Sequence, residues 1–333
     1  MKKFIIGPSE EGIRLDKQLK KILNNAGSGF VYKMLRKKNI TLNNRKAEGN
    51  EHLKKGDVIK IFLSDETFDK FSADSYQKIG SRGSLYGSDP DFCHRIIYED
   101  SNILMYDKPV GILSQKADKD DISVNEICLS YLMDKGEISG ESLRVFKPSV
   151  CNRLDRNTSG LIIFAKNYKA AALFSRALKD RLIHKYYLCM VKGRIDKEGE
   201  AGAYLVKDER TNRVSVSDKQ KSDSSSVSIA YRPLKYNDDY SLLEVELITG
   251  KSHQIRAQMA HLDHPLLGDY KYGDRKLNDS LKERFDAGSQ LLHSHKLVIP
   301  SGIDPDLEPY AGTYTAPVPK AVEDMVSGLF EEK

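Results

Sequence analysis

The stretch from Cys151 to Gly160 constrains the fold of this chain most strongly, because an uninterrupted apolar run follows it at once. Its residues are Cys-Asn-Arg-Leu-Asp-Arg-Asn-Thr-Ser-Gly, and Leu-Ile-Ile-Phe-Ala occupy positions 161–165. A short apolar run bounded by turn residues is typical of a strand that is buried on both faces. The polar turn before the run places Asp155 between two arginines. We therefore expect Asp155 to lie at the mouth of a sheet, on a rigid element.

An Arg-Leu-Asp string by itself does not identify an active site. Arg14-Leu15-Asp16-Lys17 is nearly the same string, and it falls within a predicted amphipathic helix. A loop aspartate that is neutralised by neighbouring arginines is the commoner role of such a string. The interpretation of Asp155 therefore depends on the other motifs along the chain.

The length and composition of the chain exclude several classes of protein. Its 333 residues allow two domains, and a hydrophobic content of 39% supports a sizeable core. The apolar run at residues 1–6 is too short for a signal peptide, and no later run reaches membrane-spanning length. We therefore expect a cytoplasmic protein without a membrane partner. The formal net charge of +5 is a mild basic bias that is compatible with a polyanionic partner.

Neither the cysteines nor the histidines of this chain have the spacing of a metal site. The four cysteines, at positions 93, 128, 151 and 189, form no close pair, which argues against a zinc ribbon and a disulfide framework. We expect four buried, reduced thiols. His253, His261 and His264 lack the spacing and carboxylate partners of a catalytic zinc helix. We therefore predict no metal, and structural or RNA-contacting roles for these histidines.

The N-terminal segment has the pattern of a compact, basic unit. Apolar residues recur at helical spacing over 15–23 and over 30–35, with a break at Gly27-Ser28-Gly29. Residues 40–42 and 57–63 are predicted strands. The polar faces of the two predicted helices carry many lysines and arginines and few acids. Clustering of one sign of charge on a small unit predicts a phosphate-binding surface.

Residues 12–63 resemble an S4-type RNA-binding domain. The resemblance is carried by Gly12–Lys17, by Lys33–Lys38 leading into Ile40–Asn43, and by Gly56–Ile59. It implies that a basic helix contacts folded RNA by shape and phosphate recognition. The RNA-binding residues that it indicates are Arg14, Lys17, Lys33, Arg36, Lys37 and Lys38. We place this domain at 1–65, a flexible Gly/Ser/Asp-rich linker at 66–92 and a second domain at 93–333.

Short strands predominate in the second domain. Predicted strands lie near 95–98, 103–106, 161–165, 185–192, 203–206, 214–216, 227–231, 242–247 and 291–297. Helices are predicted over 123–133, after Asn167, up to His261 and over 317–330. This pattern is α+β with much sheet, without the regular βαβ alternation or the Gly-rich phosphate loop of a nucleotide-binding fold.

The motifs of residues 93–300 resemble, in the same order, those of the RluA-type pseudouridine synthases. Arg153–Gly160 is similar to the catalytic motif of this family. Further similar segments are Lys108-Pro109-x-Gly111, Lys185-x-Tyr187, Thr249–Arg256, His264–Asp269 and Leu292-His293. The family often has His where this chain has Asn152. Because Asn also forms hydrogen bonds to RNA or backbone, we expect altered loop contacts rather than lost activity.

This resemblance implies both a fold and a chemistry. The fold would be α+β: a small α/β S4-type domain, then a catalytic domain built on a mixed, mainly antiparallel sheet. The reaction would be isomerisation of uridine to pseudouridine in RNA, which needs no cofactor because no redox step occurs. Asp155 would be the catalytic carboxylate, and Arg256 the cation that keeps it ionised. Tyr187 would stack on the flipped base and help to move its proton, and Arg153 would prop the gap that the base leaves.

Several alternatives remain open within and beyond this family. A synthase with an S4-type domain, like RluC and RluD, is expected to act on large-subunit ribosomal RNA, and tRNA is the alternative substrate. An inactive RNA-binding assembly factor is a second alternative, although the presence of Asp155, Tyr187 and Arg256 argues against it. A carboxylate-based nucleoside or glycoside hydrolase would need a second acidic partner, and no candidate is evident. We expect a monomer.

Overall fold

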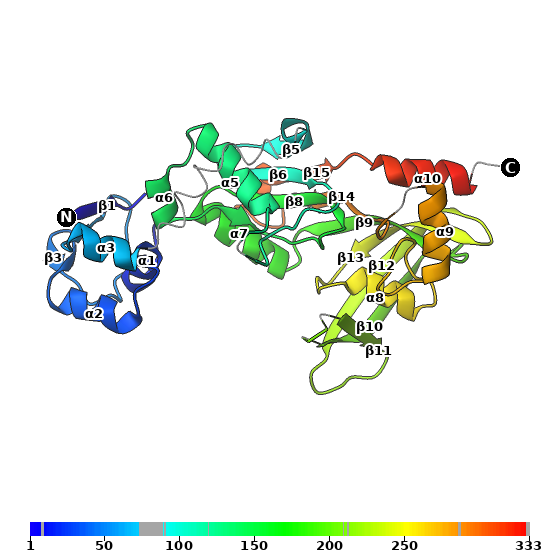
Figure 1. The fold of residues 1–333 in the computed structure, drawn as a ribbon, viewed down its shortest axis with the longest axis horizontal. Coiled ribbons are helices and arrows are strands. Elements are labelled where there is room, and N and C mark those ends of the chain that lie inside the picture. The colour runs from blue at the N-terminus through cyan, green and yellow to red at the C-terminus, as the bar shows by residue number, and fades with distance from the viewer. Residues whose placement is uncertain are drawn as a thin grey trace.

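The computed structural model describes most of the chain, with an N-terminal unit at one end of a larger body (Figure 1). Most of the predicted linker at 66–92 lies outside the described residues. Within the described part, no helix is long and apolar enough to cross a membrane. The described residues are 1–7, 10–72, 89, 91–118, 120–208, 210–211, 213–285 and 288–330.

The N-terminal unit packs helices against a four-stranded antiparallel sheet with the strand order β1-β4-β2-β3. Its elements are β1 (Lys2–Ile5), α1 (Leu15–Ile22), α2 (Ser28–Arg36), β2 (Ile40–Leu42), β3 (Arg45–Lys46) and β4 (Val58–Ile61). Leu15, Leu19 and Ile22 of α1 are buried, as their helical spacing predicts. Both predicted helices and both predicted strands are therefore confirmed, whereas β1 and the two-residue β3 are additional strands that the sequence did not reveal.

A third helix, α3 (Asp65–Phe71), corrects the predicted start of the flexible linker at residue 66. The Ser64 side chain caps it by accepting a hydrogen bond from the Thr67 N–H at 3.2 Å. Phe68 is fully buried in the core of the N-terminal unit, and the Phe71 ring lies 4.1 Å from that of Phe30. Two aromatic anchors thus order a segment whose polar composition alone suggests a linker.

The larger body is built on an eleven-stranded sheet with the order β11-β10-β12-β13-β9-β14-β8-β6-β5, to which β15 and β7 add at β14 and β8. All pairings are antiparallel except that of β14 with β8, so the predicted mixed, mainly antiparallel α+β architecture is confirmed. The strands are β5 (Ile96–Glu99), β6 (Ile103–Lys108), β7 (Ser149–Val150), β8 (Ser159–Ala165), β9 (His184–Lys192), β10 (Gly199–Asp208), β11 (Arg213–Ser217), β12 (Ser225–Tyr236), β13 (Tyr240–Leu247), β14 (Leu292–Ile299) and β15 (Gly312–Thr315).

Helices cover both faces of this sheet. They are α5 (Val124–Asp134), α6 (Gly140–Val145), α7 (Tyr168–Lys179), α8 (Gln254–His261), α9 (Arg275–Phe285) and α10 (Lys320–Phe330), with short 3₁₀ turns at Phe92–Arg95 and Glu308–Tyr310. The predicted Asn167 cap of α7 is confirmed, because its side chain accepts a hydrogen bond from the Ala170 N–H at 2.9 Å. Helices α6 and α9 were not predicted.

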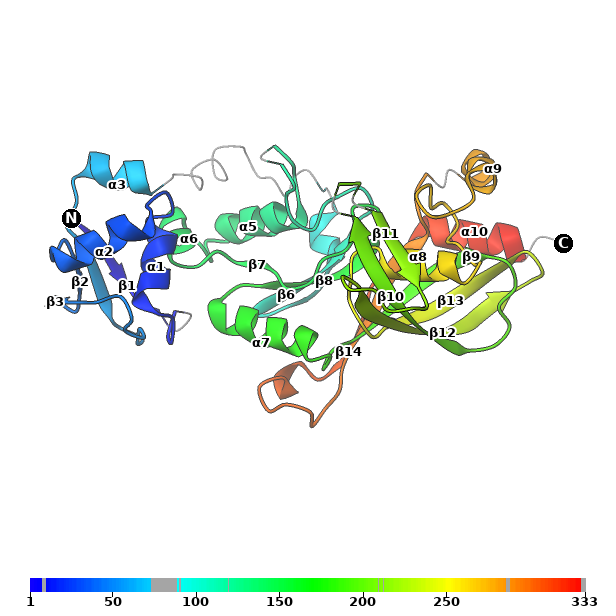
Figure 2. The same cartoon turned by 90° about the horizontal axis from the view of Figure 1, so that it is seen from below.

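Strand β8 lies between two apolar cores, as its uninterrupted apolar run predicts. Figure 2 shows α5 and α7 on opposite sides of this part of the sheet. Ile162 and Phe164 join the core that includes α5, whereas Leu161 and Ile163 join the core that includes α7. The turn that carries Asp155 therefore leads into a strand whose residues are all buried, where β8 meets β14.

The N-terminal unit contacts the body through α1 and α6, which lie side by side in both views (Figures 1 and 2). The Lys21 ammonium lies 5.5 Å from the ring centroid of Tyr168 and 6.0 Å from that of Phe146. Burial lowers the pKa of Lys21, and the charge of Glu10 opposes this shift. This contact joins the two parts of the chain by cation–π packing.

Candidate active site

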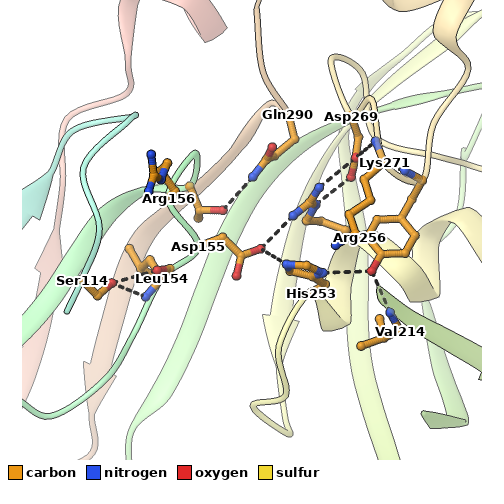
Figure 3. Close-up of polar contacts among 12 residues, drawn as sticks. Ser114, Leu154, Asp155, Arg156, Val214, His253, Arg256, Asp269, Lys271 and Gln290 are labelled. Carbon is orange, nitrogen blue, oxygen red and sulfur yellow. Dashed lines mark hydrogen bonds and ion pairs between the residues drawn. The ribbon is translucent and has the colours of Figure 1, made fainter. Parts of the chain in front are cut away.

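The backbone on each side of Asp155 is held by the segment 108–114, and Figure 3 shows the contact of Ser114 with Leu154. The Ser114 hydroxyl donates to the Leu154 carbonyl at 2.8 Å and accepts from the Leu154 N–H at 2.9 Å. The Gly111 N–H donates to the Arg156 carbonyl at 2.9 Å. These hydrogen bonds clamp the residues before and after Asp155, so its carboxylate, with a side-chain exposure of 26%, is presented on a fixed backbone.

The buried side chain of Lys108 binds backbone carbonyls of the segment 108–114 and of the Asp155 turn. Its fully buried ammonium donates to the carbonyls of Pro109 at 2.8 Å, Ile112 at 2.7 Å and Arg156 at 2.9 Å. Burial lowers the pKa of Lys108 to about 7, and the charges of Asp155 and Asp107 oppose that shift. The Lys-Pro-x-Gly string is thus a loop organised around a lysine that also supports the Asp155 turn.

Arg256 joins Asp155 to a second carboxylate, that of Asp269. Its Nη1 donates to Asp155 Oδ2 at 3.0 Å, while Nε and Nη2 donate to Asp269 Oδ2 at 2.7 Å and Oδ1 at 2.9 Å. The two-pronged bond to Asp269 fixes the plane of the guanidinium and aims Nη1 at Asp155. The structure therefore brings Asp155 and Arg256 together, although they are far apart in the sequence.

Asp269 is a site residue that sequence reasoning missed. Its side chain is fully buried. Burial favours its neutral form, but the hydrogen bonds and charge of Arg256, with the N–H groups of Lys271 and Tyr272, lower the pKa of Asp269. Its position at the end of the His264–Asp269 motif could have indicated this role. A single half-exposed carboxylate such as Asp155 does not compensate a buried arginine, so a second carboxylate was to be expected.

Tyr187 on β9 is buried, with an exposure of 5%, in the same apolar cluster as Leu154. Burial raises the pKa of Tyr187 to about 12, and the negative charge of Asp155 adds to this shift. The phenol is therefore protonated at neutral pH. It lies close enough to Asp155 for the two groups to influence one another.

The arginines that flank Asp155 do not pair with it. The exposed side chains of Arg153 and Arg156 form no ion pair within the described residues, so neither neutralises the carboxylate. Asn152 has a structural role, since its side chain accepts from the Ile163 N–H at 2.8 Å and donates to the Leu161 carbonyl at 3.2 Å. These two hydrogen bonds extend the pairing of β7 with β8 beyond Val150, so Asn152 contacts the backbone of β8.

The predicted RNA-binding residues of the N-terminal unit lie apart from this site, at the other end of the molecule from α8 (Figure 1). Arg14 forms an ion pair with Asp16 at 3.0 Å. The others are exposed and form no ion pair in the part of the chain that the structure describes; they are Lys17, Lys33, Arg36, Lys37 and Lys38. Their charges remain available at the surface.

The described residues contain no group of three or more His, Cys, Asp and Glu side chains that could hold a metal ion. The four cysteines are free thiols. Burial is confirmed only for Cys128 and Cys189, because Cys151 is half-buried and Cys93 is exposed. Cys93 lies in a short surface 3₁₀ turn before β5, which explains why the expectation of four buried thiols is wrong.

Comparisons with known proteins point to one family. Residues 102–261 match the family model described as RNA pseudouridylate synthase. The chain is 31% identical over 288 residues to the ribosomal large subunit pseudouridine synthase C of Rickettsia bellii, covering 86% of this chain and 89% of that protein. It is 33% identical over 246 residues to the ribosomal large subunit pseudouridine synthase D of Borreliella burgdorferi, covering 73% of this chain and 70% of that protein.

A solved structure shares the fold. The human RNA pseudouridylate synthase domain containing 4 superposes with a TM-score of 0.57 at 19% sequence identity, over 72% of this chain and 95% of the human chain. At this identity the likeness concerns the fold alone.

Proposed function

The chain belongs to the RNA pseudouridylate synthase family and isomerises uridine to pseudouridine in RNA, and we propose that its substrate is the RNA of the large ribosomal subunit. The names of the similar proteins from Rickettsia and Borreliella support this choice over tRNA. The basic N-terminal unit fits a structured RNA substrate of either kind, since structured RNA offers many phosphates to an exposed cationic surface.

The proposed chemistry centres on Asp155. The bond between ribose C1′ and uracil N1 breaks, the base turns, C1′ bonds to C5, and the proton on C5 leaves while N1 gains one. Asp155 acts as the nucleophile or base of this sequence, and the adjacent Arg256 favours its ionised form. Atoms and electrons balance without an oxidant, so the reaction needs no cofactor.

Two further residues, Arg153 and Tyr187, assist base flipping and proton transfer in this proposal. Flipping a base out of its stack costs a few kcal/mol. The exposed Arg153, two residues from Asp155, props the gap that the base leaves. Tyr187 offers a ring face to the base. Because its phenol is protonated at neutral pH, its hydroxyl accepts the proton from C5 while its own proton goes to water, which supplies the proton that N1 gains.

The observation that carries the proposal is the guanidinium shared by Asp155 and Asp269. A hydrolase with two catalytic carboxylates needs its second acid free to protonate a leaving group. Asp269 is fully buried and both of its oxygens bind Arg256, so it supports Asp155 instead. An inactive assembly factor would have no need for this arrangement around a half-exposed carboxylate.

The substrate is tested by mapping pseudouridines in ribosomal RNA and tRNA from cells with and without the gene. We expect the losses to be confined to a few large-subunit sites and to be restored by a plasmid copy but not by Asp155→Asn. Losses confined to tRNA would contradict the proposed substrate, and no loss in either RNA would favour the inactive assembly factor.

We also propose that the N-terminal unit is an S4-type domain that binds RNA phosphates through α2 and the turn after it. Replacing Lys33, Arg36, Lys37 and Lys38 together by glutamine should leave the fold intact, because all four side chains are exposed. Each lost phosphate contact should make the slope of log affinity against log salt shallower by about 0.7 to 0.9. Turnover at saturating RNA should change little.

The matched control exchanges the same four residues among Lys and Arg and so retains every charge. Binding of one ribosomal RNA fragment is measured for the three proteins across a salt series. If the glutamine variant keeps the salt slope of the control, these four side chains do not contact RNA phosphates.

A further inference from the structure

His253 adopts an unusual backbone conformation at the start of α8, beside Asp155. Its φ of 56° and ψ of 17° lie in the left-handed region, which residues with a Cβ adopt uncommonly. A residue with such a strained backbone persists only where contacts of its side chain or backbone stabilise that conformation. The half-buried ring of His253 has two such contacts, one from each nitrogen, and they point in opposite directions (Figure 3).

The contact of Nδ1 determines which ring nitrogen carries the proton. The Tyr272 hydroxyl oxygen accepts a hydrogen bond from the Val214 N–H at 3.0 Å and lies 2.9 Å from His253 Nδ1. The backbone donor occupies the oxygen, so the hydroxyl proton is directed to Nδ1. This network, together with the Asp155 carboxylate that faces Nε2, favours the tautomer with hydrogen on Nε2.

The contact of Nε2 is with Asp155. Nε2 lies 3.8 Å from Asp155 Oδ2, the same oxygen that accepts the 3.0 Å hydrogen bond from Arg256. Oδ1 of Asp155 has no partner among the described residues, and Figure 3 shows it turned away from both groups. Arg256 therefore binds Oδ2 by a hydrogen bond, and Nε2 of His253 faces the same oxygen at a distance longer than a hydrogen bond, while Oδ1 is left unoccupied.

We propose that His253 is a positioning residue for the reaction: with its ring held by Tyr272, it and Arg256 anchor Oδ2 of Asp155 so that Oδ1 is the oxygen that reacts. This inference rests on the proposed function. The inference adds His253 to the pair of Asp155 and Arg256, and it distinguishes the two oxygens of Asp155. Tyr272 affects Asp155 only indirectly, by orienting the ring of His253.

Burial, more than any neighbouring charge, favours the neutral form of the His253 ring. Burial lowers its pKa below the ordinary 6.5, Asp155 opposes this shift, and Arg256 and Lys271 add to it. The charge of Asp269 raises the pKa, and Arg213 lies across the Tyr272 ring at 5.5 Å. A protonated ring would bind Asp155 as a full ion pair and would displace the Tyr272 proton, so turnover should fall as the pH drops through this pKa.

The first test is His253→Gly. Glycine adopts the left-handed conformation without strain, which offsets part of the packing lost with the ring, so this variant should still fold. Its single-turnover rate on bound RNA should nevertheless fall about ten- to hundredfold, since a misplaced reacting group costs that much, with RNA affinity unchanged. Asp263→Gly is the matched control, because Asp263 also has a positive φ, at the other end of α8, and is exposed.

A wild-type rate in His253→Gly, or an equal loss of rate in Asp263→Gly, would overturn the proposal. The conservative variant His253→Gln restores an N–H near the position of Nε2 and should recover part of the lost rate. No recovery in a folded Gln variant would contradict the role given to this N–H.

A second test needs no turnover. Nitrogen-15 NMR of labelled histidine should show His253 with hydrogen on Nε2 in the wild type, and Tyr272→Phe should allow hydrogen on Nδ1 and move the acid limb of the rate to higher pH. Hydrogen on Nδ1 in the wild type would refute the proposal. If instead the wild-type protein forms no pseudouridine in any RNA, the proposed function fails while the tautomer measurement still tests the arrangement.

Discussion

Replacing Asp155 by asparagine is expected to abolish pseudouridine formation while leaving RNA affinity within about threefold of the wild type. The substitution removes the reactive charge but hardly changes the shape of the side chain. Its amide oxygen can still accept the hydrogen bond from Arg256, whose plane is fixed by Asp269. The fold should therefore survive.

The measurement is single-turnover pseudouridine formation with purified protein in excess over RNA, next to a binding titration. Asp180→Asn is the matched control, because Asp180 is an exposed aspartate at the end of α7 and should retain full activity. Turnover by pure Asp155→Asn protein would refute the role of this carboxylate.

Replacing Gly160 by alanine is expected to destabilise the body by about 4 kcal/mol or more, which is exceptional for a single methyl group. An added Cβ would lie 2.2 Å from the Ser294 carbonyl oxygen, and the φ of Gly160 is +109°. Relief of this clash must separate β8 from β14, which pair in parallel only at His293–Ser159 and Ser294–Gly160. The 2.8 Å hydrogen bond between Ser159 and His293 would be lost with them.

Denaturant unfolding midpoints measure this effect. Gly202→Ala in β10 is the control, since an added Cβ there meets nothing within 4 Å and no strained φ is involved. Its stability should stay within about 1 kcal/mol of the wild type. Equal midpoints for the two variants would show that the close approach of β8 and β14 is not required.

Much of the fold could be predicted from local patterns. The run 161–165 predicted a strand buried on both faces, and β8 is buried between the cores that contain α5 and α7. Helical spacing predicted α1 and α2, whose apolar residues face the N-terminal core. These predictions succeed because the period of apolar residues depends on the geometry of one element and on one buried face.

The elements that were missed depend on partners far away in the sequence. Strand β1 has four residues and is defined by its pairing with β4, more than fifty positions later. Helix α3 is ordered by the packing of Phe68 and Phe71 within the N-terminal unit. Helix α9 has only Leu277, Leu281 and Phe285 on its apolar side, and this face is completed by α10. Short or polar segments carry too few apolar residues to specify an element alone.

The sequence by itself determined that Asp155 stands on a turn before a buried strand, and the order of its motifs placed the chain in its family. It also indicated Arg256 as a partner, by resemblance. Only the tertiary structure decided that Asp155 pairs with Arg256 and not with the neighbouring Arg153 and Arg156. It also decided that Asp269 and His253 lie beside this pair. The physical reason is solvation: exposed arginines are stabilised by water, whereas the buried Arg256 requires carboxylates that only the folded sheet brings to it.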